Sequence, residues 1–244
     1  MDLIQIVWLA VITVIGSYIQ SVSGFGFGIF AMLFLPNLLL FTEANMLSSI
    51  LSLLTSATVV LATFRQIHWK NITFPALGCI AASLFAVAFV KSQKNETMVL
   101  LLGIAMCLLS LYFFFFSGKI KIKPTWYAGL IAGVLSGIMG GLFSTGGPPA
   151  VIYFLQSEED SDRYLPTISA YFVLTNFSLI VTKAVAGFIT VNVWLGLAVG
   201  VVGMIVGSLI GKSTREKIKP AVLKKIVYAV MACGGIVNIL KVLM

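Results

Sequence analysis

The first stretch that interrupts the apolar pattern of this 244-residue chain reads Ser23-Gly24-Phe25-Gly26-Phe27-Gly28, with Pro36 downstream. The second reads Gly140-Gly141-Leu142-Phe143-Ser144-Thr145-Gly146-Gly147-Pro148-Pro149. Gly28 and Gly147 are about 119 residues apart, which is close to half the length of the chain. Paired glycine and proline interruptions at matching places in two halves of a membrane protein are the best sequence indication of a transport site.

The composition is that of an integral membrane protein. Hydrophobic residues make up 59% of the chain and charged residues only 10%, whereas a soluble domain has about 25% charged residues. Apolar stretches of roughly 18–22 residues recur, each long enough to cross a hydrocarbon core of about 30 Å. Asp2 stands where a signal peptide would carry basic residues, so we expect the first span to be retained. The sequence predicts one all-α transmembrane domain over residues 1–244.

Apolar runs and breakers divide the chain into two similar halves, 1–117 and 124–244, joined by a basic linker, 118–123. Each half is predicted to contain a broken or re-entrant helix hairpin followed by three transmembrane helices. In the first half the expected segments are Leu3–Gln20, Ile29–Phe41, Ala44–Phe64, Ile72–Val90 and Met98–Phe116. In the second half they are Trp126–Met139, Ala150–Gln156, Leu165–Ala186, Val191–Gly211 and Ala221–Val242.

The hairpin enters and leaves by the same face, and three further spans make the number of crossings in each half odd. The second half therefore starts from the opposite face, and the two repeats are expected to have inverted topology. Twelve cations then fall on one face: Arg65, Lys70, Lys119, Lys121, Lys123, Arg163, Lys212, Arg215, Lys217, Lys219, Lys224 and Lys225. Four fall on or near the other: Lys91, Lys94, Lys183 and Lys241. The positive-inside rule makes the first face cytoplasmic and places both termini outside the cytoplasm of a cell inner membrane.

The two breaks have the chemistry of an anion site. Unpartnered backbone groups inside a bilayer cost several kcal/mol, so a break is tolerated only where it is buried in protein or lines a polar cavity. Each break places a helix N-terminus, with free N–H groups, at membrane depth. Hydroxyls such as Ser21 lie at the same depth. The residues expected to bind substrate are Ser23, Gly24, Phe25, Gly26, Gly28, Gly140, Gly141, Ser144, Thr145, Gly146, Gly147, Pro148 and Asn176.

Close helix packing is the alternative explanation of these glycines, because small residues line many membrane helix interfaces. The glycines here are dense, are combined with proline and hydroxyl residues, and occur at matching places in both halves. A functional break is therefore favoured over packing alone.

The segment from Gly137 to Tyr153, Gly-Ile-Met-Gly-Gly-Leu-Phe-Ser-Thr-Gly-Gly-Pro-Pro-Ala-Val-Ile-Tyr, resembles the second-half signature of the TauE/SafE sulfite exporter family, within the 4-toluene sulfonate uptake permease superfamily. The first break followed by Pro36 resembles the first-half signature, and the similarity covers essentially the whole chain. Phe27 stands where a third consecutive glycine is common in that family, which leaves the subfamily open. The resemblance implies a transporter of small sulfur oxyanions or organosulfonates, such as sulfite, thiosulfate or sulfoacetate.

Polar residues inside the later spans are secondary candidates. Asn176, next to Thr175, makes either a hydrogen bond between helices or a contact with substrate. Lys183 is the one cation expected within the membrane region, and from the last turn of its span it is expected to snorkel outward. Four residues near span ends are expected to be structural: Asn45, Ser48, Ser49 and Thr167.

Acidic residues and the single histidine are expected outside the membrane core. The cluster Glu158–Arg163 is predicted to be a solvated loop, and His68 an interfacial residue. All eight carboxylates map to loops or termini: Asp2, Glu43, Glu96, Glu158, Glu159, Asp160, Asp162 and Glu216. Coupling of transport through a buried carboxylate is therefore not expected.

These features predict a secondary transporter that works by alternating access around the two breaks, with export favoured because a negative cytoplasm expels anions. An anion channel and a non-transporting membrane subunit stay open as alternatives. An enzyme is not expected, because no nucleophile, metal-ligand cluster or acid–base pair is evident. Neither a cofactor, metal, nucleotide nor nucleic acid is predicted to bind. The expected partners are the small anion and membrane lipid. The sequence is also compatible with a homo-oligomer.

Overall fold

A computed structural model describes residues 2–116, 123–158, 161–214 and 220–243; of the side chains within these ranges, those of 116, 161 and 220–226 are not described. The described residues form helices and two short 3₁₀ turns, η1 and η2, in this order: α1 Leu3–Ser23, α2 Phe27–Phe34, η1 Leu35–Asn37, α3 Phe41–Thr63, η2 Phe64–Gln66, α4 Trp69–Ser92, α5 Asn95–Phe116, α6 Trp126–Phe143, α7 Gly147–Ser157, α8 Ser161–Val185, α9 Val191–Thr214 and α10 Pro220–Leu243. Every predicted segment corresponds to one of these helices. The all-α prediction is confirmed for the described parts of the chain.

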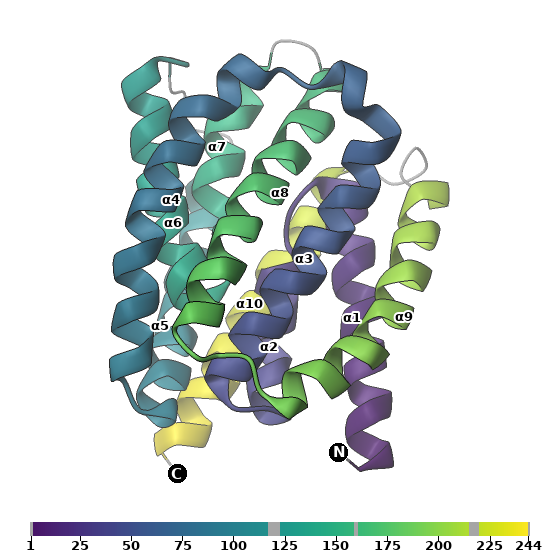
Figure 1. Cartoon of the computed structure of the whole chain (residues 1–244), viewed down its shortest axis with the longest axis vertical. Coiled ribbons are helices and arrows are strands. Elements are labelled where there is room, and N and C mark those ends of the chain that lie inside the picture. Colours follow the sequence, from purple (N-terminus) through teal and green to yellow (C-terminus); the bar gives the residue numbers. More distant parts are fainter. Residues whose placement is uncertain (1, 117–122, 159–160, 215–219, 244) are drawn as a thin grey trace.

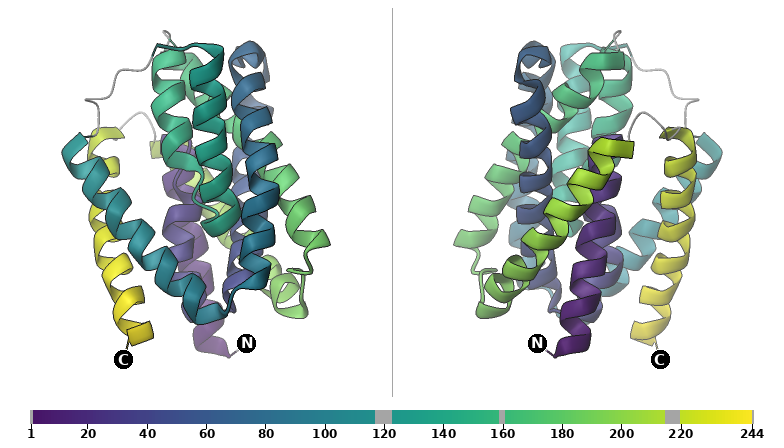
Figure 2. Two further views of the ribbon diagram at one scale, coloured as in Figure 1. Left: turned by 90° about the vertical axis from the view of Figure 1, so that its left-hand side faces the viewer. Right: turned by 90° about the vertical axis from the view of Figure 1, so that its right-hand side faces the viewer.

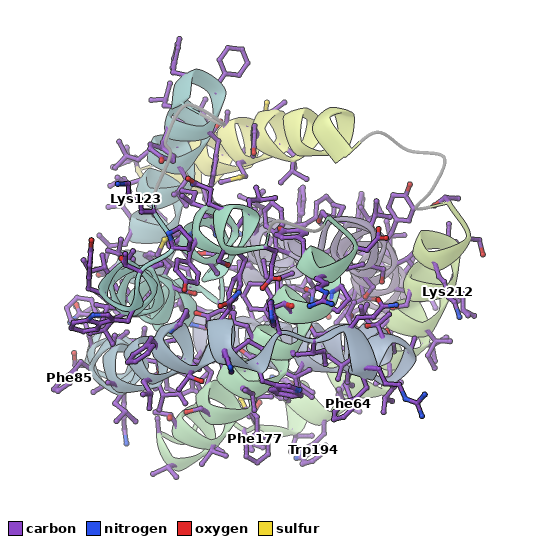
Figure 3. All side chains as sticks on the ribbon, turned by 90° about the horizontal axis from the view of Figure 1, so that it is seen from above. Phe64, Phe85, Lys123, Phe177, Trp194 and Lys212 are labelled. Carbon is purple, nitrogen blue, oxygen red and sulfur yellow. The ribbon has the colours of Figure 1, made fainter. Side chains whose placement is uncertain are left out.

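Seven of the described helices are long and apolar enough to cross a membrane: α1, α3, α4, α5, α6, α8 and α9. The apolar part of α10 with described side chains, Val227–Leu243, is shorter, as is the stretch Phe27–Asn37 that contains α2. Many large apolar side chains are exposed on the outer surface, among them Phe64, Phe85 and Trp194. Figure 3 shows these side chains pointing away from the bundle, as expected for a surface that faces lipid tails.

The helices pack in pairs that each join the two halves of the chain. α1 lies along α9 and α4 along α6, while α3 packs on α8 and α5 on α10. The α5–α10 pair stands at one side of the bundle, and α4, α6 and α7 lie together (Figure 2). Both termini lie at the same end of the molecule (Figure 1).

Glycine stripes bring two of these pairs close together. Gly203 and Gly207 of α9 face backbone carbonyls of α1, and Gly133 and Gly137 of α6 face backbone carbonyls of α4. A Cβ atom at any of these glycines would overlap the neighbouring helix. Small residues thus allow tight packing in this fold, as they do in other membrane helix pairs.

The described cations other than Lys183, which is buried, divide between the two ends of the bundle as the sequence predicts. Those placed opposite the termini by their elements are Arg65, Lys70, Lys123, Arg163 and Lys212. Lys91, Lys94 and Lys241 belong to the end that carries the termini. Of the other cations in the count, Lys119, Lys121, Arg215, Lys217 and Lys219 lie outside the described residues, and the side chains of Lys224 and Lys225 are not described.

Candidate functional site

The first break joins α1 to α2 through two glycines in the left-handed region. Gly24 ends α1 with φ +82° and donates its N–H to the Gln20 carbonyl, while Gly26 begins α2 with φ +107°. Residues with a Cβ atom rarely adopt such backbone angles, so glycine allows the chain to reverse direction here. The first turn of α2, from Phe27 onward, leaves its N–H groups without partners inside the helix.

The second break joins α6 to α7 through one left-handed residue, while Gly146 begins α7 with φ −66°. Ser144 ends α6 with φ +54°, and its N–H donates to the Gly140 carbonyl at 2.9 Å. Among the described residues it is the one non-glycine with positive φ. Pro148 and Pro149 lie in the first turn of α7, where a missing N–H costs little. Because proline has no backbone N–H, the second break lacks two N–H donors that the first break has.

The two breaks touch each other. A Cβ atom at Gly28 would overlap the carbonyl oxygen of Ser144, and one at Gly147 would lie 3.1 Å from the ring of Phe25. Between the breaks is a cavity of about 30 Å³, enough for one or two water molecules. Its lining comprises Gln20, Phe25, Gly26, Gly28, Ile29, Ser52, Cys79, Ser136, Gly140, Ser144, Thr145, Gly146, Gly147, Phe172, Thr175, Asn176 and Leu179.

Nine of the thirteen residues expected to bind substrate line this cavity: Phe25, Gly26, Gly28, Gly140, Ser144, Thr145, Gly146, Gly147 and Asn176. The other four lie beside it. Ser23 donates its hydroxyl to the carbonyls of Ile19 and Phe25. Gly24 packs against α8 and Gly141 against α4, while Pro148 lines an apolar groove between α5, α6 and α7.

A polar network on the first-half side of the cavity was not predicted. The Gln20 amide donates to the Ser52 carbonyl at 2.9 Å and to the Ser56 hydroxyl at 2.7 Å, and the Ser52 hydroxyl donates to Gln20 Oε1. The Asn176 amide donates to the Ser52 hydroxyl at 3.3 Å. Asn176 therefore bonds another helix and also lines the cavity. Gln20 lies four residues before Gly24, and that spacing could have identified it.

The hydroxyl of Thr145 has no hydrogen-bond partner among the described residues, although the residue is only 1% exposed. An unpaired buried hydroxyl costs free energy. Thr145 lies in the turn of the second break and lines the cavity. It is therefore available to a bound molecule without breaking any bond of the protein.

The prediction that Lys183 snorkels outward is wrong. Its side chain is fully buried, because the last turn of α8 packs against α3 and the end of α6. The ammonium donates to Asn45 Oδ1 and Ser49 Oγ, both at 2.6 Å, and to Ser144 Oγ at 2.9 Å. The ammonium therefore contacts the second break at Ser144, the residue that ends α6. Lys183 is seven residues after Asn176, a spacing that places both on one helix face.

Sequence comparisons identify the family of this chain. Residues 8–237 match the family described as Sulfite exporter TauE/SafE. The chain belongs to the TauE/SafE family. It is also 22% identical over 226 residues to a protein of Cupriavidus necator named probable sulfite/organosulfonate exporter TauE, covering 88% of this chain and 86% of that protein. No solved structure matches the chain.

Membership of the TauE/SafE family agrees with the resemblance that the two breaks suggested. The chain is a multi-pass membrane transporter of a small molecule and not an enzyme.

Two carboxylates of this TauE/SafE protein are less exposed than the sequence suggested. Glu158 was expected in a solvated loop, but its side chain is 1% exposed and pairs with His68 at 3.1 Å. Glu43 lies in the first turn of α3 and is also buried, where it accepts bonds from Thr190 and Asn192. Glu159 and Asp160 of the predicted loop lie outside the described residues.

Proposed function

We propose that this protein is a secondary transporter that exports a small sulfur-containing anion, of the class of sulfite, thiosulfate or an organosulfonate such as sulfoacetate. The family and the name of the Cupriavidus necator relative support this substrate class. The substrate would bind where the two breaks meet, held by the N–H groups at the start of α2 and by hydroxyls of the second break.

One observation carries the site assignment: two breaks from distant parts of the chain converge on a single polar cavity. Gly28 and Ser144 are in contact, and Thr145, whose buried hydroxyl has no partner among the described residues, lines the cavity beside them. Helix N-termini attract anions through their N–H groups and dipoles. A cavity of about 30 Å³ is small for such a substrate, so the site must widen when a substrate enters.

The pairing of the helices supports inverted repeats and alternating access. Exchanging α1–α5 for α6–α10 turns the α1–α9 pair into the α6–α4 pair and leaves the α3–α8 and α5–α10 pairs unchanged. The first half begins at the end that carries both termini, and the second half begins at the opposite end (Figure 2). Rocking of one such half against the other would expose a shared site to each side in turn.

The distribution of cations supports a cytoplasmic location for the end opposite the termini. With both termini outside, the membrane potential would favour outward movement of an anion by about 2.3 kcal/mol per charge at 100 mV. Import would require a co-transported ion to overcome this term. Export is therefore the direction we propose.

Counterflow in proteoliposomes tests the proposal directly. Purified protein would be reconstituted and offered sulfite, thiosulfate, sulfate, sulfoacetate and taurine, with and without gradients of pH and potential. We expect saturable flux of at least one sulfur anion that increases with an outward-driving potential. Flux that does not saturate would instead indicate an anion channel, and no flux with any of these solutes would indicate a non-transporting subunit.

Substitution at the breaks tests where the substrate binds. A leucine at Gly26 would clash with Ile19 and would be strained at the positive φ of this position. A leucine at Gly146 would clash with the Ser136 carbonyl. We expect Gly26→Leu and Gly146→Leu to abolish transport while the protein still inserts and purifies. Normal counterflow by both variants would contradict the site.

A further inference from the structure

The buried ammonium of Lys183 has no acidic partner. Within the described ranges no carboxylate oxygen lies within 4 Å of its Nζ atom, and the neighbours that it contacts are neutral oxygens. Three short contacts, to Asn45, Ser49 and Ser144, match the three N–H bonds of an ammonium. Burying a charge without a counter-charge is costly unless something else compensates it.

The cavity lies immediately beyond the residues that hold this ammonium. Ser144 accepts a bond from Lys183 at 2.9 Å, the Gly140 carbonyl lies 3.5 Å from the same nitrogen, and both residues line the cavity. A negative charge in the cavity would therefore lie one residue layer from the ammonium. In an interior of low dielectric that attraction is only weakly screened.

We propose that Lys183 is a specificity-determining residue that selects sulfonates carrying net negative charge over zwitterionic aminosulfonates. The inference rests on the proposed function and refines its substrate class. An anion in the cavity neutralises the buried charge of Lys183. A zwitterion brings its own ammonium, which is repelled by Lys183 and offsets that gain.

Two sulfonates of the same length distinguish these cases: 2-hydroxyethanesulfonate, which is an anion, and 2-aminoethanesulfonate, which is a zwitterion at neutral pH. In proteoliposomes the native protein is expected to transport the hydroxy compound at least about tenfold more efficiently. Equal efficiency for the two compounds would overturn the proposal without any variant being made. Absence of flux for every sulfur anion would instead reject the proposed function on which it rests.

Variants then assign the preference to one side chain. Lys183→Gln is expected to lower the efficiency for the hydroxy compound about tenfold, to leave that for the amino compound nearly unchanged, and so to bring their ratio close to one. Lys183→Arg keeps the charge and should keep most of the preference. Lys241→Gln removes the same charge from an exposed lysine that bonds Asn37 and should change nothing. A folded Lys183→Gln protein with the native ratio would overturn the assignment.

A second, independent observation concerns the two buried carboxylates at opposite ends of the bundle. Glu43 accepts bonds from Thr190 at 2.7 Å, from Asn192 at 3.0 Å and from the N–H of Leu40 at 3.1 Å. It ties the connection between α2 and α3 to the connection between α8 and α9. These connections lie at the end of the molecule that carries the termini (Figure 1).

Glu158 makes the equivalent tie at the other end. It accepts a bond from the Asn71 amide at 2.8 Å and pairs with His68 at 3.1 Å, while Asn71 also donates to the Ser157 carbonyl. It joins the connection between α7 and α8 to the start of α4. Exchanging the two halves of the chain converts the elements joined by Glu43 into those joined by Glu158.

We propose that these carboxylates are two latches, each of which holds one end of the transporter closed over the central site. Each latch joins the segment that follows the C-terminal end of α2 or α7 to the opposite half of the chain. Opening toward one face would break the latch at that face and leave the other intact.

The native thiol of Cys79 reports the opening, because it is buried and lines the cavity. Cys107 and Cys233 would be replaced by alanine, and an impermeant sulfonate-bearing methanethiosulfonate would be applied to sealed vesicles of each orientation.

We expect Glu158→Ala to speed modification of Cys79 about tenfold from the face opposite the termini, and Glu43→Ala to do so from the terminal face. The exposed Glu96→Ala is the control, expected to modify at the native rate. Equal acceleration from both faces, or none, would overturn the latches.

Discussion

The two breaks end their first helix in the same way but differ in the residues that follow and in their chemistry. Gly24 and Ser144 both end a helix in the left-handed region, whereas Gly26 begins α2 with φ +107° and Gly146 begins α7 with φ −66°. The first break is built of glycine and keeps its N–H groups. The second lacks two N–H groups at Pro148 and Pro149 but adds hydroxyls, one of which accepts a bond from the buried Lys183 of α8. One break thus supplies shape and backbone donors, and the other supplies side chains.

The contact between the breaks is expected to be the most sensitive point. Gly28→Leu would drive a side chain into the carbonyl of Ser144, and backbone cannot move aside cheaply in a packed interior. We expect transport to fall at least about 100-fold, because a displacement of this kind separates the two halves of the site. Counterflow per milligram of reconstituted protein measures the loss.

Gly187 is the matched control for this substitution. It also has positive φ, but a Cβ atom there would meet nothing within 4 Å, and asparagine tolerates left-handed backbone. Gly187→Asn should transport at close to the native rate. Comparable losses in both variants would mean that loss of transport reports general damage and not the contact between the breaks.

Exchanging the left-handed residues that end α1 and α6 separates backbone from side-chain roles. Ser144→Gly removes the hydroxyl that Lys183 and Asn45 share, so transport should fall about 10-fold to 100-fold. The cost of the unpaired Lys183 N–H should be offset largely by the ease with which glycine adopts the positive φ at this position, so stability should change little. Gly24→Ser adds a Cβ that would lie 2.8 Å from Ile168, and it should destabilise the protein by about 1–3 kcal/mol.

Thermal unfolding in detergent and counterflow, measured on both proteins, check this exchange. The expected pattern is a stability defect at position 24 and a transport defect at position 144. The reverse pattern would show that the first break, and not the second, supplies the polar side chains.

Thr145 offers a substitution with a smaller effect and a clear control. Its hydroxyl bonds no described residue, so Thr145→Val should fold with native stability. If the hydroxyl binds substrate, the apparent affinity should fall about tenfold, as for loss of one hydrogen bond to a charged group. Thr145→Ser keeps the hydroxyl and should retain most of the affinity. An unchanged substrate concentration at half-maximal flux in Thr145→Val would remove Thr145 from the site.

Much of the fold follows from the sequence because membrane helices have strong local signatures. The apolar runs and the glycine breaks predicted every helix, and the largest difference lies after α2, where the helix ends at Phe34 and a 3₁₀ turn carries the chain through Pro36. Proline lacks the N–H that a longer helix would need. The breaks also predicted eight of the seventeen residues that line the cavity, because a broken helix is tolerated in a membrane only where it is buried in protein or lines a polar cavity.

The positions of the charged residues were harder to predict, since they depend on how helices tilt and pack. Lys183 lies near the end of its span, where a lysine usually reaches water, but here α3 and α6 enclose it. Glu158 follows α7 in a polar loop, yet the start of α4 covers it. Distance along the chain gives membrane depth but does not show what surrounds a side chain at that depth.

Substitution of Ser23 should change transport least among these residues, and it tests whether side chains of the first break bind substrate. Its hydroxyl donates to the carbonyls of Ile19 and Phe25, both local partners within the first break. Ser23→Ala should lower the free energy of unfolding by about 1 kcal/mol and leave transport within roughly twofold of the native rate. Counterflow over a range of substrate concentrations, alongside thermal unfolding, tests this. A tenfold loss of affinity at native stability would mean that Ser23 turns toward the substrate during transport, and the first break would then contribute side chains as the second does.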